Sequence, residues 1–202
     1  MRVIAGSARG HNLKMPGGGK TRPAMDRVKG SLFSILLSRL EGCRFLDLFA
    51  GSGSLGIEAL SRGGSYAAFV DTSSQCIQAI RENLEHTKLV DRGAVFRDDC
   101  LHFIKARSLD PFDIVCIDPP YLKGFLAPIL DAIPESSLFG PRTIFIIERQ
   151  KKDDIGLQKR PRLSLIDERL FGDTVLTFFR LTPAGSSTLT SPEPQHSPNT
   201  ET

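Results

Sequence analysis

Short runs of aliphatic, aromatic and β-branched residues recur along the chain and alternate with segments whose apolar residues follow a helical period. The strand-like runs are RFLDLF (44–49), YAAFVD (66–71), AVFRDD (94–99), FDIVCID (112–118), TIFIIER (143–149), LSLIDER (163–169) and TVLTFFRL (174–181). Helix-like segments lie between the earlier runs, at 54–62, 73–88, 99–107 and 124–133. Strands that alternate with helices form a parallel sheet covered on both faces. The pattern therefore predicts an α/β, Rossmann-like fold.

The end of this pattern departs from a purely parallel sheet. Only LFGD (170–173) separates the last two strand-like runs, and four residues suit a hairpin but not a helix. We therefore expect seven strands, with an antiparallel hairpin at the end of the sheet. This is not the usual arrangement of a dinucleotide-binding fold.

A different pattern precedes residue 44. Val3-Ile4 and Leu13-Lys14-Met15 flank a turn, which predicts a small N-terminal β-hairpin, and GGGK (17–20) predicts a flexible joint. Asp26 is expected to cap a helix. The apolar residues that follow it have a 3.6-residue period: Val28, Leu32, Ile35, Leu36 and Leu40.

These patterns divide the chain into three parts. Residues 1–20 form a basic N-terminal hairpin extension, residues 21–182 form the main domain, and residues 183–202 form a tail. Twelve of the twenty tail residues are Pro, Ser or Thr. Such a segment cannot bury enough apolar surface to offset the entropy of ordering it, so we expect the tail to be disordered.

Composition narrows the possible classes of function. The chain has 202 residues, of which 40% are hydrophobic, enough to bury a core. No apolar run approaches the roughly 20 residues that span a bilayer, and the N-terminus lacks a signal-peptide core. The cysteines are scattered without a C-x-x-C pair, so no metal site or disulfide framework is expected: Cys43, Cys76, Cys100 and Cys116. We expect a soluble, cytoplasmic protein with no membrane partner.

The net charge of +3 is unevenly distributed. Residues 1–44 contain nine Lys or Arg and two acidic residues, a net charge of 9 − 2 = +7, which leaves −4 for the remainder. A basic segment of this kind favours a polyanionic partner, because neutralising phosphates is its main source of affinity. Charge alone therefore favours a nucleic acid as the partner.

A glycine-rich stretch follows the first strand-like run. FAGSGSLG (49–56) has the G-x-G-x-x-G spacing of the dinucleotide fingerprint. Asp71, twenty residues beyond Gly51, suits a ribose in that interpretation. Asp47, however, would point into the ligand crevice and repel a pyrophosphate, whereas a ligand with a cationic end would pair with it. S-adenosylmethionine carries an ammonium and a sulfonium but no phosphate, and Asp71 could hold its ribose equally well.

The tetrapeptide Asp118-Pro119-Pro120-Tyr121 follows the buried run FDIVCI. In an open α/β sheet this strand end lies beside the glycine-rich turn. Asp118 and the carbonyl of Pro119 can accept the two hydrogens of an exocyclic amine, and proline fixes φ and so holds that carbonyl in place. Tyr121 offers a face on which an extruded base can stack. This combination predicts methylation of an amine on a planar base.

Three motifs together resemble one known family. LDLFAGSGSLGIEALSRG (46–63), IDPPY (117–121) and TRPAMDRVKGSLFSIL (21–36) are similar to the bacterial 16S ribosomal RNA guanine-N2 methyltransferases. The resemblance extends from Met1 to about Leu181 and excludes the tail. It implies a class I methyltransferase fold, S-adenosylmethionine as cofactor, and 16S rRNA in the small subunit or its assembly intermediate as partner of a monomeric enzyme.

The resemblance also implies individual roles. The methionine end of S-adenosylmethionine would be lined by Asp47, Ala50, Gly51, Ser52 and Gly53. Asp71 would hold the ribose, and Asp99 with Cys100 would recognise the adenine, although the adjacent Asp98 leaves open which of the two acids reaches it. The catalytic residues would be Asp118, Pro119 and Tyr121. RNA would be contacted by Arg9, His11, Lys14, Lys20, Arg22 and Arg27.

Other functions remain open at this point. DNA adenine-N6 methyltransferases also use DPPY, and protein glutamine-N5 methyltransferases use a related tetrapeptide. About twenty residues separate Tyr121 from the next strand-like run, which leaves no room for a DNA target-recognition segment. A catalytically idle, RNA-binding assembly factor with the same fold is a third alternative. KRPR (159–162) could extend an RNA-binding face.

Overall fold

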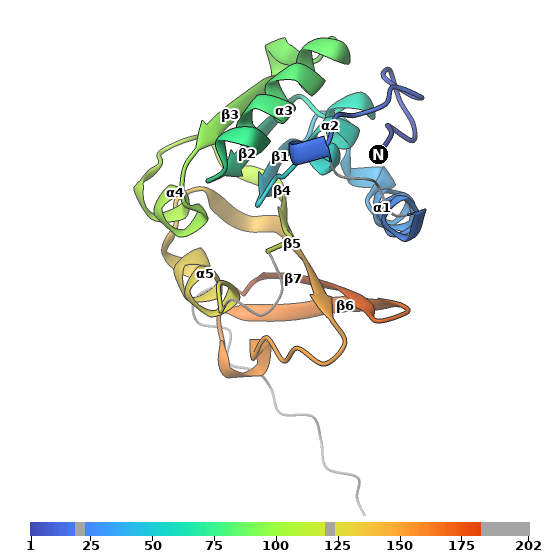
Figure 1. The fold of residues 1–202 in the computed structure, drawn as a ribbon. Helices are drawn as coiled ribbons and strands as arrows, with labels where there is room; N and C mark the ends of the chain where they lie inside the picture. The colour runs from blue at the N-terminus through green and yellow to red at the C-terminus, as the bar shows by residue number, and fades with distance from the viewer. Residues whose placement is uncertain (19–22, 120–123, 183–202) are drawn as a thin grey trace, which may run out of the picture.

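A seven-stranded sheet in the order β3-β2-β1-β4-β5-β7-β6 organises the molecule (Figure 1). This computed structural model describes residues 1–18, 23–119 and 124–182. The strands are β1 (Arg44–Leu48), β2 (Tyr66–Asp71), β3 (Gly93–Arg97), β4 (Phe112–Ile117), β5 (Phe139–Gln150), β6 (Leu163–Phe171) and β7 (Thr174–Leu181). The first five are parallel, and β7 runs antiparallel to both β5 and β6. The sheet and its antiparallel end confirm the sequence prediction.

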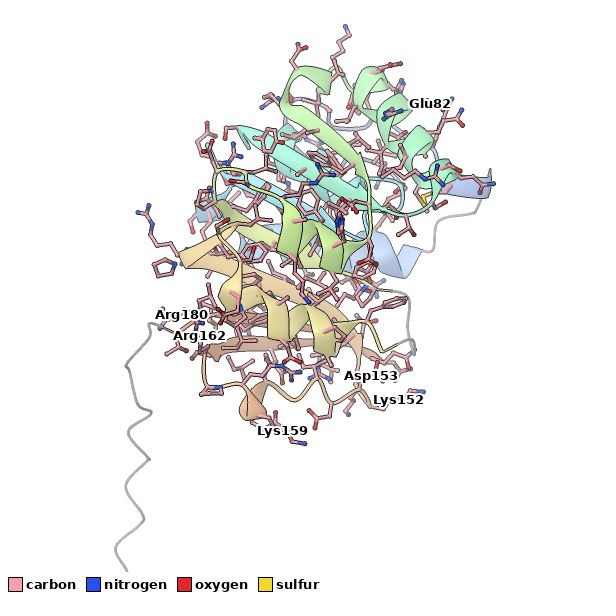
Figure 2. The ribbon with its side chains drawn as sticks, turned by 90° about the vertical axis from the view of Figure 1, so that its left-hand side faces the viewer. Glu82, Lys152, Asp153, Lys159, Arg162 and Arg180 are labelled. Carbon is pink, nitrogen blue, oxygen red and sulfur yellow. The ribbon has the colours of Figure 1, made fainter. Side chains whose placement is uncertain are left out.

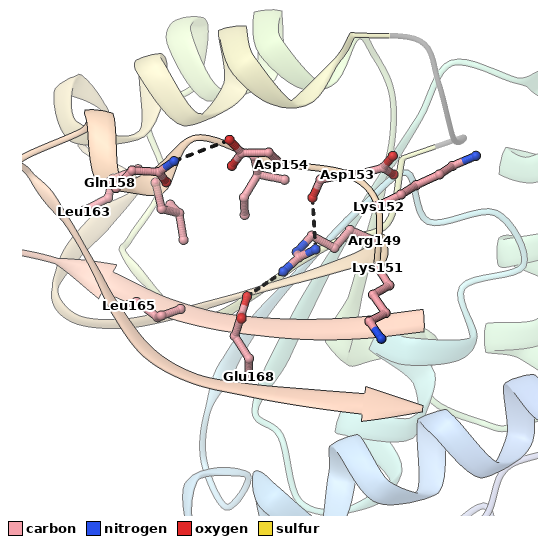
Figure 3. A pocket seen from close by; sticks show the side chains of 11 residues that line it. Arg149, Lys151, Lys152, Asp153, Asp154, Gln158, Leu163, Leu165 and Glu168 are labelled. Carbon is pink, nitrogen blue, oxygen red and sulfur yellow. Dashed lines mark hydrogen bonds and ion pairs between the residues drawn. The ribbon is translucent and has the colours of Figure 1, made fainter. Parts of the chain in front are cut away.

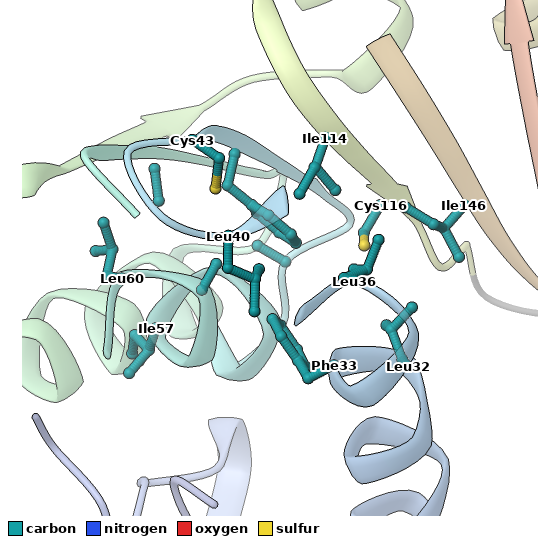
Figure 4. Packing of buried hydrophobic residues seen from close by; sticks show 14 of the residues in the cluster. Leu32, Phe33, Leu36, Leu40, Cys43, Ile57, Leu60, Ile114, Cys116 and Ile146 are labelled. Carbon is teal, nitrogen blue, oxygen red and sulfur yellow. The ribbon is translucent and has the colours of Figure 1, made fainter. Parts of the chain in front are cut away.

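Helices cover both faces of this sheet. They are α1 (Pro23–Ile35), α2 (Ser54–Ser61), α3 (Ser74–His86), α4 (Cys100–Ala106) and α5 (Leu126–Ala132). Residues of α1, α2 and α3 belong to the core on one face, and residues of α4 and α5 to the core on the other. Figure 4 shows the first of these cores, where Phe33 of α1 and Leu36, just after this helix, pack together with Ile57 of α2 and Cys116 of β4. The central strands are therefore covered on both sides, which explains their continuous apolar runs.

Helix α1 begins four residues earlier than a cap at Asp26 predicts. We expected Asp26 to be the cap, but the helix starts at Pro23, and Asp26 lies within its first turn. Proline suits the first helical position, because its fixed φ is already helical and its missing N–H would have no partner there. A carboxylate in the first turn still interacts favourably with the helix dipole.

The N-terminal β-hairpin is not present as a pair of strands. Residues 1–13 fold back on themselves with one isolated antiparallel bridge, between Arg2 and Asn12. The N–H groups of Ile4 and Ala5 donate instead to the Glu58 carboxylate, at 2.8 and 3.0 Å. The Glu58 side chain thus holds the segment against α2.

Close packing fixes the path of this N-terminal segment. The N–H of Ala8 donates to Ser61 Oγ at 2.9 Å, and Ser61 Oγ donates to the carbonyl of Ala5 at 2.6 Å. Gly6 has a φ of 84°, and a Cβ there would collide with the carbonyl of Ser61. Only glycine therefore allows the chain to pass this close to the end of α2. Within the described ranges, no helix has the length and apolar character of a membrane span.

Candidate active site

The carboxyl edge of the parallel strands brings the predicted site residues together. Leu48 of β1 pairs with Val70 of β2 and with Ile117 of β4, and Ile117 pairs with Ile147 of β5. The residues that follow these positions therefore share one level of the sheet: Phe49, Asp71, Asp118 and Glu148. In an open parallel sheet, ligands bind outside the carboxyl ends of the strands, at the point where the strand order reverses. In this sheet that point lies between β1 and β4.

The glycine-rich turn leaves β1 in a conformation that few residues adopt. Phe49, Gly51 and Gly53 have φ angles of 62°, 55° and 75°, all in the left-handed region. Phe49 is not a glycine, so its backbone stores strain of the kind found at ligand sites. The N–H of Gly53 closes the turn on the carbonyl of Ala50 at 2.7 Å. Ser52, also in this turn, is buried.

Two aspartates hold this turn through backbone donors. Asp47 Oδ2 accepts from the N–H of Gly56 at 3.0 Å. Asp71 Oδ2 accepts from the N–H of Gly51 at 2.9 Å, and its Oδ1 accepts from Ser73 at 2.9 Å. Both carboxylates have further lone pairs for a ligand. A cofactor on this turn would therefore meet acidic groups whose positions are already fixed.

Burial places Asp47 in an electrostatically unfavourable position. The side chain is 2% exposed, and its pKa is raised from 3.8 to about 7. Desolvation is the largest cause, and the negative charge of Asp71 adds to it, while the hydrogen bond from Gly56 acts in the opposite direction. A cation beside Asp47 would restore its ionised form.

Asp118 lies in a similar environment one strand away. Its half-buried side chain follows β4, and its pKa is raised well above the usual value by desolvation, then by the charges of Glu148 and Asp47. Pro119 is buried beside it. Tyr121, the predicted stacking residue, lies outside the described residues.

The structure gives different surroundings to the two candidate adenine acids. Asp98 accepts from Arg107 Nη2 at 3.0 Å and pairs with His102 Nδ1 at 2.7 Å. Asp99 is exposed, caps α4 and accepts from the N–H of His102 at 3.0 Å. Cys100 is buried. Since Asp98 is engaged by the side chains of Arg107 and His102, the exposed Asp99 is the more accessible of the two acids for a ligand.

The donor set at this edge fits S-adenosylmethionine. Asp47 and Asp118 are acids whose raised pKa values favour a cationic neighbour, which the ammonium and sulfonium groups supply. Asp71 offers carboxylate oxygens of the kind that hold ribose hydroxyls. A pyrophosphate would add negative charge to a cluster that is already acidic, so this edge does not suit a dinucleotide.

Comparison with known proteins agrees with this chemistry. The model of the family described as "Conserved hypothetical protein 95" matches residues 1–180. The chain belongs to this family. It is 39% identical over 158 residues to the Bacillus subtilis protein named "Putative rRNA methyltransferase YlbH", which covers 77% of this chain and 85% of that protein.

Two Escherichia coli comparisons cover more of the chain. The protein named "Ribosomal RNA small subunit methyltransferase D" is 29% identical over 188 residues, 93% of each chain. The solved structure described as "Putative methyltransferase yhhF" has a TM-score of 0.77 and 28% identity, covering 90% of this chain and 97% of that one. With the acidic turn that fits its cofactor, this member of the Conserved hypothetical protein 95 family is an S-adenosylmethionine-dependent methyltransferase.

The predicted RNA-binding residues of the N-terminal segment lie far from this edge. Arg9 follows Ser7, whose N–H donates to the carbonyl of Ser61 at the far end of α2 (2.8 Å). The ring of His11 packs edge-on against that of His86 at the end of α3, with centroids 5.1 Å apart. Helix α3 starts at the carboxyl edge and rises 1.5 Å per residue, so its end is about 18 Å away. These two residues are not part of the methyl-transfer site.

The remaining predicted RNA-binding residues differ in whether their charge is already paired and in whether the structure describes them. Lys14 Nζ forms an ion pair with Glu82 at 2.8 Å, which partly neutralises its charge. Arg27 is exposed on α1. Lys20 and Arg22 lie outside the described residues. Their contact with RNA stays a prediction.

Sequence reasoning missed three residues that shape the site. Glu148 stands beside Asp118 at the end of β5, and its position after the apolar run TIFII could have indicated this. Phe125, 38% exposed, packs against Phe49 with ring centroids 5.7 Å apart. Asn83 on α3 donates to the carbonyls of Ser52 (2.9 Å) and Lys14 (3.0 Å). No sequence pattern marked Asn83, because it bridges segments that meet only in the folded chain.

Proposed function

We propose that this protein transfers a methyl group from S-adenosylmethionine to the exocyclic N2 amine of a guanine in 16S ribosomal RNA of the small subunit. The observation that carries the proposal is the position of Asp118-Pro119 beside the Asp47 turn, one strand apart at the carboxyl edge. The names of the Bacillus and Escherichia relatives support ribosomal RNA as the substrate.

The chain itself supplies positioning and electrostatics. When bound, S-adenosylmethionine supplies an electrophilic methyl group. Asp47, Gly51 and Asp71 would hold it, with Asp99 and Cys100 at its adenine end. Asp118 and the carbonyl of Pro119 would accept the two hydrogens of the guanine amine and fix its lone pair toward the methyl group. Such alignment lowers the barrier, because the reacting atoms are held in an attack geometry.

Asp118 also acts through its charge. The amine nitrogen becomes positive as it is methylated, and a carboxylate hydrogen-bonded to it stabilises that charge by roughly a few kcal/mol. Its raised pKa makes Asp118 a suitable acceptor for the proton that leaves the nitrogen. Tyr121 would stack on the target base.

The N-terminal segment would contact a different part of the RNA. Arg9 and His11 lie near the far ends of α2 and α3, so a nucleotide in the methyl-transfer site cannot touch them. They would bind backbone phosphates of a neighbouring helix or strand of the particle.

The direct test is transfer of labelled methyl groups to small ribosomal subunits from cells that lack the enzyme, followed by nucleoside analysis. We expect label in one N2-methylguanosine, and none when Asp118→Ala replaces the wild type. Label in N6-methyladenosine of DNA, in glutamine of a protein, or in no acceptor while S-adenosylmethionine still binds would overturn the proposal.

A further inference from the structure

A groove beside the methyl-transfer edge has no role in the reaction described above. It lies between β6 and the segment 151–158 and has a volume of about 450 Å³ (Figure 3). Its lining is partly apolar, from Ile155, Leu157, Leu163 and Leu165, and partly charged. Leu165 is 54% exposed and therefore offers an apolar surface within the groove.

The acidic groups of the groove are already occupied by the chain. Glu168 Oε1 accepts from Arg149 Nη2 at 2.7 Å. Asp154 accepts from the N–H of Gly156 at 2.8 Å and from Gln158 at 3.4 Å. Asp153 Oδ2 accepts from the N–H of Gln150 at 3.4 Å. The carboxylates therefore stabilise the turn and the neighbouring arginine.

Lys151 and Lys152 differ from these groups. Both are exposed, and neither forms an ion pair with another described residue. Figure 3 shows their ammonium groups extending away from the Arg149–Glu168 pair. The N–H of Lys151 donates to the carbonyl of Asp173 at 2.8 Å, so the backbone that presents the two lysines is fixed. The groove thus presents two available positive charges.

The position of these lysines relates them to the reacting base. Glu148 is level with Asp118 on the adjacent strand, and Lys151 follows it by three residues, about 10 Å at the rise of a strand. Figure 2 places Lys152 on one side of the molecule and Arg162 and Arg180 on the opposite side. Arg160 and Arg162 are also paired, with Asp131 (2.7 Å) and Glu135 (2.6 Å). Among the described residues at this end of β5, Arg149 is paired with Glu168, whereas Lys151 and Lys152 form no ion pair with a described residue.

We propose that this groove binds the single-stranded RNA next to the target guanine, an inference that rests on the proposed function. Lys151 and Lys152 would contact two backbone phosphates, and Leu165 would provide an apolar face for one unstacked base. Sequence-specific enzymes that act on RNA bases commonly use unpaired segments, whose bases are open to such contacts.

The test compares two doubly substituted proteins of equal charge. Lys151→Ala/Lys152→Ala removes the groove lysines, and Lys105→Ala/Arg142→Ala removes two exposed cations near the opposite, amino edge of the sheet. Affinity for small subunits is measured as a function of salt, together with KM and kcat. Single-stranded contacts change the logarithm of affinity by about 0.7 per phosphate per decade of salt, so the groove variant should lose about 1.4 from the slope. Its KM should rise about tenfold at unchanged kcat, and the control should match the wild type.

A second pair of variants tests the apolar face. Leu165→Ala should weaken binding about threefold without changing the salt slope, because it removes packing but no charge. Leu37→Ala, at a position 65% exposed on the surface, should have no effect.

The outcomes separate this inference from the proposed function. Equal affinity and salt slope for the groove variant, its control and the wild type would overturn the inference, even if N2-methylguanosine is formed. Weaker binding with an unchanged slope for Lys151→Ala/Lys152→Ala would indicate a protein contact and also overturn it. If the wild type forms no N2-methylguanosine, but Lys151→Ala/Lys152→Ala still loses affinity and salt slope relative to the wild type and the control, the proposed function is overturned and the RNA contact of the groove is supported.

Discussion

Three acidic side chains lie close together at the carboxyl edge of the sheet in the protein without ligand: Asp47, Asp118 and Glu148. Burial makes this costly, as the raised pKa values of Asp47 and Asp118 show. Strain and repulsion of this kind are often retained where a ligand relieves them. At the scale of single residues, the same groups that prepare the site for a cationic cofactor should therefore lower the stability of the free protein.

Asp47→Asn should make the free protein more stable and weaken its binding of the cofactor. The pKa of Asp47 rises from 3.8 to about 7 on folding. The folded wild type therefore binds this proton more tightly than the unfolded chain does, and its free energy of unfolding falls as pH rises from about 4 to about 7 and stays low above that. Asparagine keeps an acceptor for the N–H of Gly56 but carries no charge. Urea unfolding without ligand gives the free energy of unfolding of Asp47→Asn and of the wild type. The value for the variant minus that for the wild type should be about 2 kcal/mol larger at pH 8 than at pH 5.

The same substitution should remove most of the affinity for S-adenosylmethionine, measured by calorimetry. Wild-type affinity should also fall as pH decreases below about 7, because protonation removes the negative charge that attracts the cation. A pH-independent difference in stability, or undiminished binding by the variant, would contradict this account of Asp47.

Asp118→Asn separates positioning of the amine from binding of the cofactor. The amide has one acceptor and no charge, so turnover should fall by at least about a hundredfold, in line with the loss of one transition-state contact. Affinity for S-adenosylmethionine should change by less than about threefold, since Asp47 and Asp71 remain. Single-turnover methyl transfer and equilibrium binding measure the two effects, and near-wild-type turnover would disprove the role of Asp118.

At the scale of elements, α2 joins the cofactor turn to the N-terminal segment. Glu58 on this helix is fully buried, with Lys29 Nζ at 3.2 Å and Arg62 Nε at 2.8 Å. Lys29 Nζ also donates to the carbonyl of Arg2 at 2.6 Å. One carboxylate thus links α1, α2 and the first residues of the chain.

Glu58→Gln should be strongly destabilising for this reason. Burial already lowers the pKa of Lys29, and Glu58 is the main group that opposes this effect. Removing the negative charge leaves a buried ammonium with insufficient compensation, which costs about 3–5 kcal/mol. Urea unfolding should show this loss, and Lys29→Met added to Glu58→Gln should recover part of it. A loss below about 1 kcal/mol would contradict a buried ion-pair role.

At the scale of the whole molecule, the protection of backbone amides from hydrogen exchange should be greatest in the central strands and lowest in the edge strands. Residues of β1 and β4 are almost all buried, whereas those of the edge strands β3 and β6 are largely half-buried or exposed. Amide hydrogen exchange should therefore be slowest in β1 and β4 and faster in β6 by about two orders of magnitude or more. Equal protection of β6 and β4 would indicate that another surface covers the edge strand.

The strands and most helices could be predicted from sequence because each reflects a local pattern. Apolar runs of β type alternated with helical segments, and the short LFGD link specified the hairpin. The start of α1 differs from the prediction, because Pro23 rather than a residue after Asp26 is the first helical residue. The predicted N-terminal hairpin is present only as a chain reversal with one antiparallel bridge, between Arg2 and Asn12. The backbone N–H groups of Ile4, Ala5 and Ala8 donate to the side chains of Glu58 and Ser61, which are more than fifty positions away.

The sequence by itself determined which chemical groups lie at the strand ends: Asp47 near the end of β1 with the glycines after it, Asp71 as the last residue of β2, and Asp118-Pro119 after β4. Their order along the chain, with the alternation of strands and helices, was enough to predict one carboxyl edge. Only the tertiary structure decided that Glu148 adds its charge beside Asp118, that Asp98 is engaged by Arg107, and that Arg9 and His11 lie far from the reaction. These facts depend on strand register and on the lengths of α2 and α3. Local patterns specify elements, whereas distances between distant residues arise only when those elements pack.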